Sequence, residues 1–289
     1  MRVFVTGGSG YIGLPTIRAL VRAGHEVNGL ARTESAADVL KANGAAVTIG
    51  TLQDLETLHS AAFSADAVIH LAQHKGRDFA AIDLAAAQAM IEGLDKRGPY
   101  IHTSGGWVYG STSGLADEGQ AINPPKLVAW RAANDSAVLD WAASGHQPVV
   151  ILPGMVYGNH GGILWSVFAK DGPESIPCIG EGTNHWPVIH VEDLAQFYVC
   201  ALTRAQAGQR YIAVSDENPR TREVLAALSR ALGAAGELVH LSHEDAKARF
   251  GVFAEAFALD QQFTARKARA DLGWAPAHRQ PLDEVEHGR

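Results

Sequence analysis

Three glycines near the start of the chain have the spacing that most clearly suggests chemistry. Gly7, Gly10 and Gly13 follow a short apolar run at residues 1–6 and precede a helical pattern at residues 14–23. A strand, a glycine loop and a helix in this order bind the pyrophosphate of a dinucleotide. Gly7 permits the tight turn, Gly10 lets the backbone approach the phosphates, and Gly13 lets the helix pack close to the strand. Amide groups at the helix start would face the phosphates, so the sequence predicts a dinucleotide site here.

The residues after the second apolar run, 26–31, bear on which dinucleotide is bound. In NAD-binding units an acidic residue at this place accepts a hydrogen bond from the ribose 2′-hydroxyl. This chain has no carboxylate there, and Arg32 is placed for a two-point contact with a 2′-phosphate. The sequence therefore favours NADP(H) over NAD(H). The alternative is a solvated arginine at the end of a strand.

Residues 6–13, Thr-Gly-Gly-Ser-Gly-Tyr-Ile-Gly, resemble the glycine loop of the extended branch of the short-chain dehydrogenase/reductase superfamily. Later stretches extend the resemblance over about residues 1–280, and they are residues 50–54, 71–73, 103–110, 153–158, 186–195 and 271–276. The resemblance implies an NAD(P)-dependent, epimerase/dehydratase-like oxidoreductase that acts on a small carbonyl, alcohol or sugar-like substrate. It also implies further dinucleotide contacts at Tyr11, Ile12, Leu52, Leu71, Ala72, Gln73, Arg131, Pro153 and Val156.

The catalytic positions depart from this family, which uses a Ser or Thr after the fifth strand and a Tyr four residues before a Lys. The tyrosine passes a proton to or from the substrate oxygen, the lysine lowers the tyrosine pKa, and the hydroxyl orients the carbonyl. Matching the family segments to this chain puts Gly105, Leu127 and Arg131 at the three positions. No tyrosine occurs between Tyr109 and Tyr157, so no shift of register restores the motif. The sequence is therefore identified as an atypical member of the branch.

If the protein is an enzyme, another group near the nicotinamide, or water, must supply the proton. Ser104 lies one residue before the expected hydroxyl position, and Tyr109 lies in the loop that is beside the substrate in the family. Arg131 could hold the nicotinamide ribose, but it cannot release a proton at working pH. Ser104, Tyr109 and Arg131 are therefore the candidate catalytic residues. Further candidates for the proton donor are Tyr157, His74, His102, His185 and His190.

The further histidines differ in what is expected of them. His102 is expected to pack in the core within a strand, and His190, with Asp193, is expected to have a structural role. His185 and Trp186 could face a substrate. If no group replaces the tyrosine, the protein binds the dinucleotide without turnover, as a sensor or regulator. An epimerase or dehydratase is less favoured, because both normally need the missing tyrosine.

Alternation of short apolar runs and helical patterns predicts the scaffold that positions these residues. Strands are expected at residues 1–6, 26–31, 45–50, 66–71, 100–103 and 148–152. Helices are expected between them at residues 14–23, 35–43, 55–63, 78–96 and 124–144. This order predicts right-handed βαβ units and a doubly wound parallel (Rossmann) sheet, an α/β fold.

The regular alternation breaks after residue 153. Later elements are expected as strands at 186–191 and 208–214 and as helices at 192–204 and 221–233. We therefore expect a dinucleotide-binding domain at residues 1–157. Residues 158–289 should form mostly a smaller substrate-binding lobe that is interleaved with the sheet.

Composition narrows the class of protein. The chain of 289 residues is 47% hydrophobic and 19% charged, which favours a large folded core. A net charge of −7 gives no indication of nucleic acid or an anionic membrane as a partner. Cys178 and Cys200 stand outside any ligand-spaced cluster, so no metal site and a cytoplasmic location are expected. A small-molecule substrate is the expected partner, and the Ala-rich helices at 78–96 and 124–144 suggest a homodimer.

Overall fold

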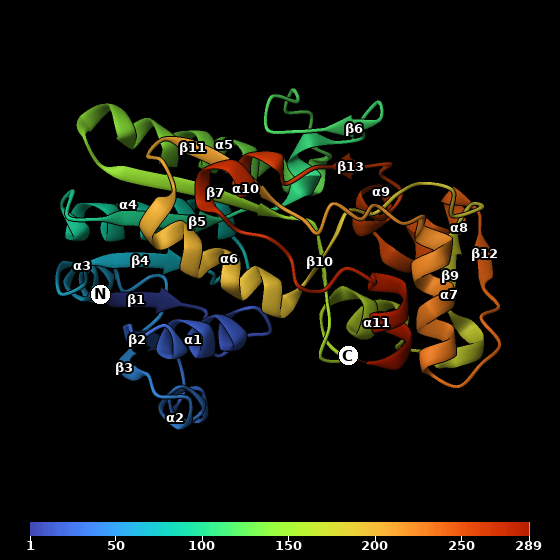
Figure 1. The fold of residues 1–289 in the computed structure, drawn as a ribbon, viewed down its shortest axis with the longest axis horizontal. Coiled ribbons are helices and arrows are strands. Elements are labelled where there is room, and N and C mark those ends of the chain that lie inside the picture. The colour runs from blue at the N-terminus through green and yellow to red at the C-terminus, as the bar shows by residue number, and fades with distance from the viewer. Residues whose placement is uncertain (289) are drawn as a thin grey trace.

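A computed structural model of the protein describes residues 1–288. Seven parallel strands form the central sheet in the order β11, β7, β5, β4, β1, β2, β3 (Figure 1). Their bounds are β1 Arg2–Thr6, β2 Glu26–Ala31, β3 Ala46–Ile49, β4 Ala67–His70, β5 Pro99–Thr103, β7 Gln147–Pro153 and β11 Gln209–Ala213. The inner strands are apolar runs buried on both faces, as a parallel sheet requires. The predicted doubly wound sheet is confirmed.

Helices cover both faces of this sheet. On one face α1 (Gly13–Arg22) packs on α6 (Val191–Arg204), and α10 (Arg266–Leu272) contacts α6 and β11. On the other face α3 (Leu55–Phe63), α4 (Phe79–Leu94) and α5 (Ala129–Asp140) pack in a row. The remaining helix of this part is α2 (Glu34–Ala42), which packs against β2 and β3.

The single helix that was expected at residues 124–144 is divided into three. A short 3-10 turn at Lys126–Val128 precedes α5, and another at Trp141–Ser144 follows it. Pro125 has an extended backbone (ψ 157°), and proline also disfavours helical geometry in the residue before it. The consecutive prolines at 124 and 125 therefore delay the regular helix to Ala129.

A smaller lobe lies beyond the carboxyl ends of the strands, at the right of Figure 1. Three short parallel pairs occur outside the main sheet, namely β8 (Met155–Tyr157) with β10 (Val188–His190), β9 (Pro177–Ile179) with β12 (Val239–Leu241), and β6 (Leu115–Ala116) with β13 (Gln262–Phe263). The α-helices of the lobe are α7 (Thr221–Ala231), α8 (His243–Phe250), α9 (Phe253–Phe257) and α11 (Pro281–His287). Single turns occur at Gly106–Tyr109, Leu164–Phe168 and Pro173–Ser175.

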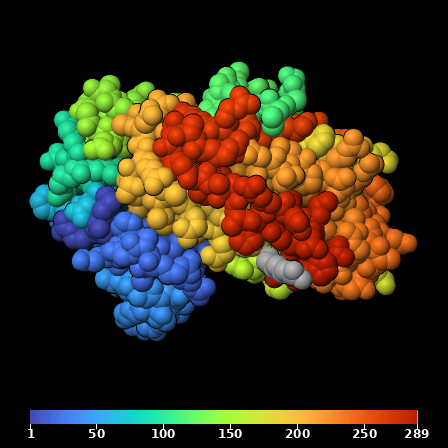
Figure 2. Space-filling view, in the orientation of Figure 1, coloured from blue at the N-terminus to red at the C-terminus, as the bar shows by residue number. Residues whose placement is uncertain are grey.

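Two hydrophobic cores follow this division. One fills the space between the sheet and its helices, and the other joins residues 155–188 to α7, α9 and α11. The C-terminal segment crosses from one core to the other, and Figure 2 shows it in red across the junction.

Asp193 holds the C-terminal segment in place. Trp274 donates a hydrogen bond to the carbonyl oxygen of Asp193, and the carboxylate of Asp193 accepts from the amides of Ala277 and His278. Asp193 thus has the structural role that the sequence suggested.

Two predictions about organisation are not tested by this fold. The division at residue 157 stays a prediction, although α6 and β11 lie beyond that residue and pack with the sheet. The homodimer also stays a prediction, and within the chain α4 and α5 pack on each other. Within residues 1–288, no helix combines the length and the apolar character that crossing a bilayer requires.

Candidate active site

The glycine loop lies at the carboxyl end of β1, directly before α1. Gly7 has a φ of +71°, and a Cβ there would lie 2.7 Å from the amide nitrogen of Ala72. At Gly13 a Cβ would lie 2.0 Å from the carbonyl oxygen of Gly7. Among the described residues, no side chain caps the start of α1, and its first turn has no acidic residue. The loop therefore presents an open helix N-terminus, which fits the pyrophosphate of a dinucleotide.

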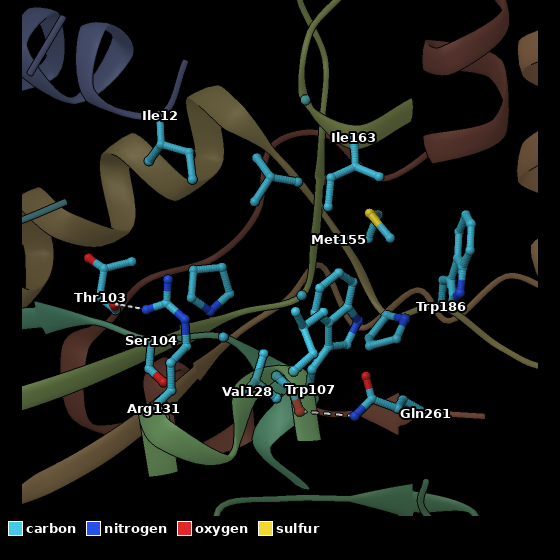
Figure 3. Close-up of a pocket in the computed structure, with 18 of the residues that line it drawn as sticks. Ile12, Thr103, Ser104, Trp107, Val128, Arg131, Met155, Ile163, Trp186 and Gln261 are labelled. Atoms are coloured by element: carbon cyan, nitrogen blue, oxygen red, sulfur yellow. Dashed lines mark hydrogen bonds between the residues drawn. The ribbon is translucent and has the colours of Figure 1, made fainter. Parts of the chain in front are cut away.

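A cavity of about 320 Å³ lies beside this loop at the carboxyl edge of the sheet. It is lined by Tyr11, Ile12, Gln73, residues 103–107, Leu127, Val128, Trp130, Arg131, residues 153–156, Gly162, Ile163, Trp186, Pro187, Phe253 and Gln261. Figure 3 shows Thr103, Ser104 and Arg131 together at one end and Met155, Ile163 and Trp186 at the other. Of the described residues in this lining, Arg131 alone carries a charge. The cavity is therefore apolar with one polar end.

Arg131 is held in place at that polar end. Its Nη2 donates to Oε1 of Gln73 at 3.0 Å, and its Nη1 donates to the carbonyl oxygen of Thr103 at 3.3 Å. The guanidinium also stacks over Trp130, with 4.5 Å from Cζ to the ring centroid. Burial lowers the Arg131 pKa while Asp83 and Asp135 raise it, and an arginine so placed stays charged. The site thus has a positioned, permanent positive charge.

Ser104 forms part of the cavity wall and is bonded to a buried carboxyl group behind it. Its Oγ donates to Oδ2 of Asp135 at 2.6 Å, and the other oxygen, Oδ1, has no hydrogen-bond partner among the described residues. Asp135 is 1% exposed. Burial raises the pKa of Asp135 to about 6, against the lowering effects of the Ser104 hydrogen bond and the Arg131 charge. A carboxyl group able to exchange protons near neutral pH therefore lies one hydrogen bond from the cavity.

A buried polar cluster continues behind Asp135. Nδ1 of His70, at the end of β4, is hydrogen-bonded to Oγ1 of Thr6 at 2.6 Å. Nε2 of the same ring lies 3.3 Å from Oδ1 of Asp83 on α4. Nε2 of His102, on β5, lies 3.6 Å from Asp83 and 3.8 Å from Asp135. Burial lowers the pKa of His102 to about 3. Burial alone would raise the Asp83 pKa, but hydrogen bonds and the nearby histidines together lower it.

Three comparisons place this architecture among known proteins. The model of the NAD dependent epimerase/dehydratase family matches residues 3–214, which is most of the chain. The chain belongs to that family. An uncharacterized protein of Schizosaccharomyces pombe is 32% identical over 96% of each chain. A 4-hydroxy-2-methyl-3-oxo-4-farnesyl-3,4-dihydroquinoline-1-oxide ketoreductase of Stigmatella aurantiaca is 26% identical over 99% of this chain and 96% of its own.

The fold agrees with solved members of the family. The Thermus thermophilus UDP-glucose 4-epimerase in complex with NAD has a TM-score of 0.81, covering 100% of this chain and 99% of its own. Its sequence identity to this chain is 22%, so that this likeness supports the fold. The resemblance drawn from the sequence motifs is confirmed.

The three residues that the sequence matched to the family's catalytic positions all line the cavity. Gly105 has an extended backbone (φ −173°), and a Cβ built there would meet nothing within 4 Å. Leu127 and Arg131 also line the cavity. That these positions correspond to the family's catalytic trio stays a prediction.

Two tyrosines suggested by the sequence do not reach the cavity. Tyr109 is fully buried against Phe263, and its hydroxyl finds no hydrogen-bond partner among residues 1–288. Tyr157 is buried and donates to Glu284. Burial raises the pKa of both phenols. The structure therefore supports neither tyrosine as a proton donor to a substrate.

None of the suggested histidines lines the cavity. His185 is bound through Nδ1 to Asp260 at 2.8 Å. His190 accepts from the amide of Glu192 at the start of α6, the structural role expected of it. His102 lies in the core, as expected, and His74 lies on the segment after β4.

The residues expected at the dinucleotide divide into two groups. Tyr11, Ile12, Gln73, Pro153 and Val156 line the cavity together with Arg131. Leu52 is buried, Leu71 and Ala72 pack beside Gly7, and Arg32 is exposed at the end of β2. Their contacts with a dinucleotide stay predictions.

Sequence reasoning missed Asp83 and Asp135 as functional groups. Asp83 is the only charged residue between Phe79 and Ile91, on a helix that is otherwise apolar. A lone acid on such a face signals a paired buried carboxylate. Asp135 lies four residues after Arg131, and no local pattern indicates its contact with Ser104.

Proposed function

We propose that the protein is an NAD(P)H-dependent oxidoreductase that reduces an uncharged, largely apolar carbonyl compound. The cavity beside the glycine loop supports this most directly, because its described lining carries the single charge of Arg131. When bound, the reduced dinucleotide supplies the hydride. The chain itself binds the phosphates at the start of α1 and encloses the substrate in the apolar end of the cavity. Arg131 stabilises negative charge that develops on the carbonyl oxygen.

The lining favours an apolar substrate over a nucleotide sugar. Trp107, Met155, Ile163 and Trp186 offer ring and aliphatic surface to a ligand. For the diphosphate of a nucleotide sugar, Arg131 is the one cationic partner among the described lining residues. The similarity to a ketoreductase of a farnesylated quinoline supports the same substrate class.

The test is turnover of carbonyl compounds by the purified protein, followed by NADPH absorbance. Aromatic and medium-chain ketones and aldehydes should be reduced, and dTDP-glucose and UDP-glucose should remain unchanged. The lost catalytic trio favours a second candidate function, a dinucleotide sensor without turnover. Tight NADPH binding with no reduction across the panel would support the sensor and contradict the reductase.

The edge of the cavity offers a prediction about the substrate. Phe253 lines the cavity and is 44% exposed, so its truncation should remove apolar contact without disturbing the core. Phe253→Ala should raise KM for aromatic ketones by about tenfold and change kcat little. The adjacent Val252 is 67% exposed and does not line the cavity, so Val252→Ala is the matched control. Equal KM values in all three proteins would contradict the proposed substrate class.

The cofactor preference is tested at Arg32. Its exposed guanidinium at the end of β2 is placed to bind a ribose 2′-phosphate, and NADP(H) is therefore the proposed cofactor. Arg32→Asp should weaken NADPH binding by at least about tenfold and NADH binding much less. Arg266→Asp makes the same charge change at an exposed position on α10 and controls for net charge. Calorimetric Kd values that rise equally for both dinucleotides would refute the preference.

A further inference from the structure

Among the described residues, the cavity lining offers no free phenol to replace the missing tyrosine. The hydroxyl of Tyr11 donates to the carbonyl oxygen of Gly158 at 2.9 Å, and that of Thr103 pairs with Tyr198 at 2.9 Å. Burial raises the pKa of Tyr11. Gln261 uses its amide to bind the carbonyl oxygens of Gly106 and Gly110. These groups are already engaged in hydrogen bonds within the protein.

Ser104 differs from these hydroxyls because its partner can itself exchange a proton. It lines the cavity, is 9% exposed, and is hydrogen-bonded to the buried Asp135. A hydroxyl both donates and accepts, so it can receive a proton from a carboxylic acid while it donates its own. The second oxygen of Asp135, which lacks a partner among the described residues, leaves this carboxyl group poorly satisfied as an anion.

We propose that Ser104 and Asp135 together supply the proton that the family tyrosine supplies in relatives. Ser104 is the catalytic residue that touches the substrate oxygen, and Asp135 acts through it. This inference rests on the proposed reductase function. It adds a proton route that differs from the Tyr and Lys pair of the family and uses a buried carboxyl group.

The step balances without any further reactant. The carbonyl carbon receives the hydride and the carbonyl oxygen receives the proton of Ser104 Oγ. As that O–H bond breaks, Asp135 Oδ2 transfers its proton to Ser104, and Asp135 becomes a carboxylate. This carboxylate then accepts a hydrogen bond from Ser104, the arrangement seen in the structure. After the alcohol leaves, water that enters the cavity returns a proton through Ser104.

The charges around Asp135 act on its pKa in opposite directions. Arg131 on the same helix and Arg210 on β11 lower the Asp135 pKa, whereas Asp83 on α4 raises it. His102 on β5 lies 3.8 Å away and stays neutral above pH 3 or so, because burial lowers its pKa to about 3. Burial remains the largest influence, and the carboxyl group titrates at about 6. It can therefore be protonated before reaction and ionised after it.

The first experiment measures reduction rates of Ser104→Ala, Ser104→Thr and Asp135→Asn between pH 5 and 8. The wild-type rate should fall as the pH rises through about 6, because Asp135 must be protonated to act. Ser104→Ala and Asp135→Asn should each lose about 100-fold in kcat and lose this pH dependence. Ser104→Thr keeps the hydroxyl and should recover most of the rate. Ser144→Ala, which removes an exposed hydroxyl in the turn after α5, is the control.

The second experiment follows the carboxyl group directly and needs no substrate. Carbon-13 NMR of aspartate-labelled protein, with Asp135→Asn to assign the signal, should show Asp135 titrating at about 6. Ser104→Ala should raise that pKa further, because the Ser104 hydrogen bond stabilises the anion. If Asp135→Asn fails to fold, the Asp135 signal is assigned instead as the one whose pKa shifts in Ser104→Ala, because Ser104 is bonded to that carboxyl group.

The outcomes separate this inference from the proposed function. Turnover by the wild type with unchanged rates and pH profiles in Ser104→Ala and Asp135→Asn overturns the proton route and leaves the reductase intact. An Asp135 signal that titrates near the ordinary value of about 4 also overturns it. Absence of turnover by the wild type overturns both.

Discussion

Replacing Gly13 by alanine is expected to abolish dinucleotide binding and to destabilise the whole domain. The new Cβ would lie 2.0 Å from the carbonyl oxygen of Gly7 and 2.7 Å from Cα of Gly8, so the backbone itself must move. Overpacking of this kind costs about 3 kcal/mol, which corresponds to a fall in Tm of roughly 6–12 °C. Affinity for the dinucleotide should fall by more than about 100-fold, because the amides of the loop lose their alignment. Thermal melting and calorimetric titration measure the two effects.

Gly10→Ala separates cofactor binding from folding. Gly10 is exposed, and a Cβ there would meet only the Gly7 carbonyl oxygen, at 3.2 Å. This variant should therefore keep nearly the wild-type Tm while the methyl group obstructs the pyrophosphate and weakens binding by at least about tenfold. If Gly10→Ala binds as tightly as the wild type, the loop does not hold the phosphates in the way we propose.

The second large effect concerns stability in acid. The pKa of His102 is lowered from 6.5 to about 3 in the folded protein, because burial penalises its charged form. The unfolded chain therefore binds a proton that the folded chain does not, and stability from this residue is lost as the pH falls from about 6.5 towards 3. The full effect is on the order of 5 kcal/mol. Asp135, whose pKa is raised to about 6, acts in the opposite direction, because its preferential protonation in the folded state stabilises the protein as the pH falls from about 6 towards 4.

Comparison with His102→Asn separates the contribution of His102 to the pH dependence of stability from the contributions of other titratable groups. Asparagine keeps a polar group near the hydroxyl of Tyr100, which is hydrogen-bonded to Nδ1 of His102 in the wild type. It has no imidazole that can titrate. It should be less stable than the wild type at pH 7.5, and this difference should shrink by about 2 kcal/mol at pH 4.5. Urea unfolding at both pH values measures the difference. His243→Asn changes an exposed histidine and controls for the loss of one imidazole; a constant difference for His102→Asn would refute a buried neutral histidine.

Much of the fold and part of the site could be predicted from local patterns. The run of apolar residues before Gly7 and the spacing of Gly7, Gly10 and Gly13 indicated strand, loop and helix, which is the order in the structure. The alternation that follows predicted the parallel sheet, because short buried strands joined by helices have few other solutions. The prolines at 124 and 125 show a limit. Their local effect on the backbone shortened a helix that the longer pattern had extended.

The proton donor could not be assigned from the sequence. Tyr109 lies in a segment that matches the family, yet packing against Phe263 turns it into the core and away from the cavity. Ser104 was a candidate, but in our proposal its ability to donate a proton depends on Asp135, which lies 31 residues away in the chain. Whether two such side chains meet depends on how a helix is rotated over a strand, and the packing of the whole core decides that rotation.

The sequence by itself determined the glycine loop, the parallel sheet and the absence of a tyrosine between Tyr109 and Tyr157, because each depends on residues that are close together in the chain. Only the tertiary structure decided that Asp83 and Asp135 lie together with His70 and His102 behind the cavity. These four residues come from two strands and two helices, and they meet because parallel strands end at one edge and α4 and α5 pack over it. Burial then gives them pKa values that no local pattern encodes.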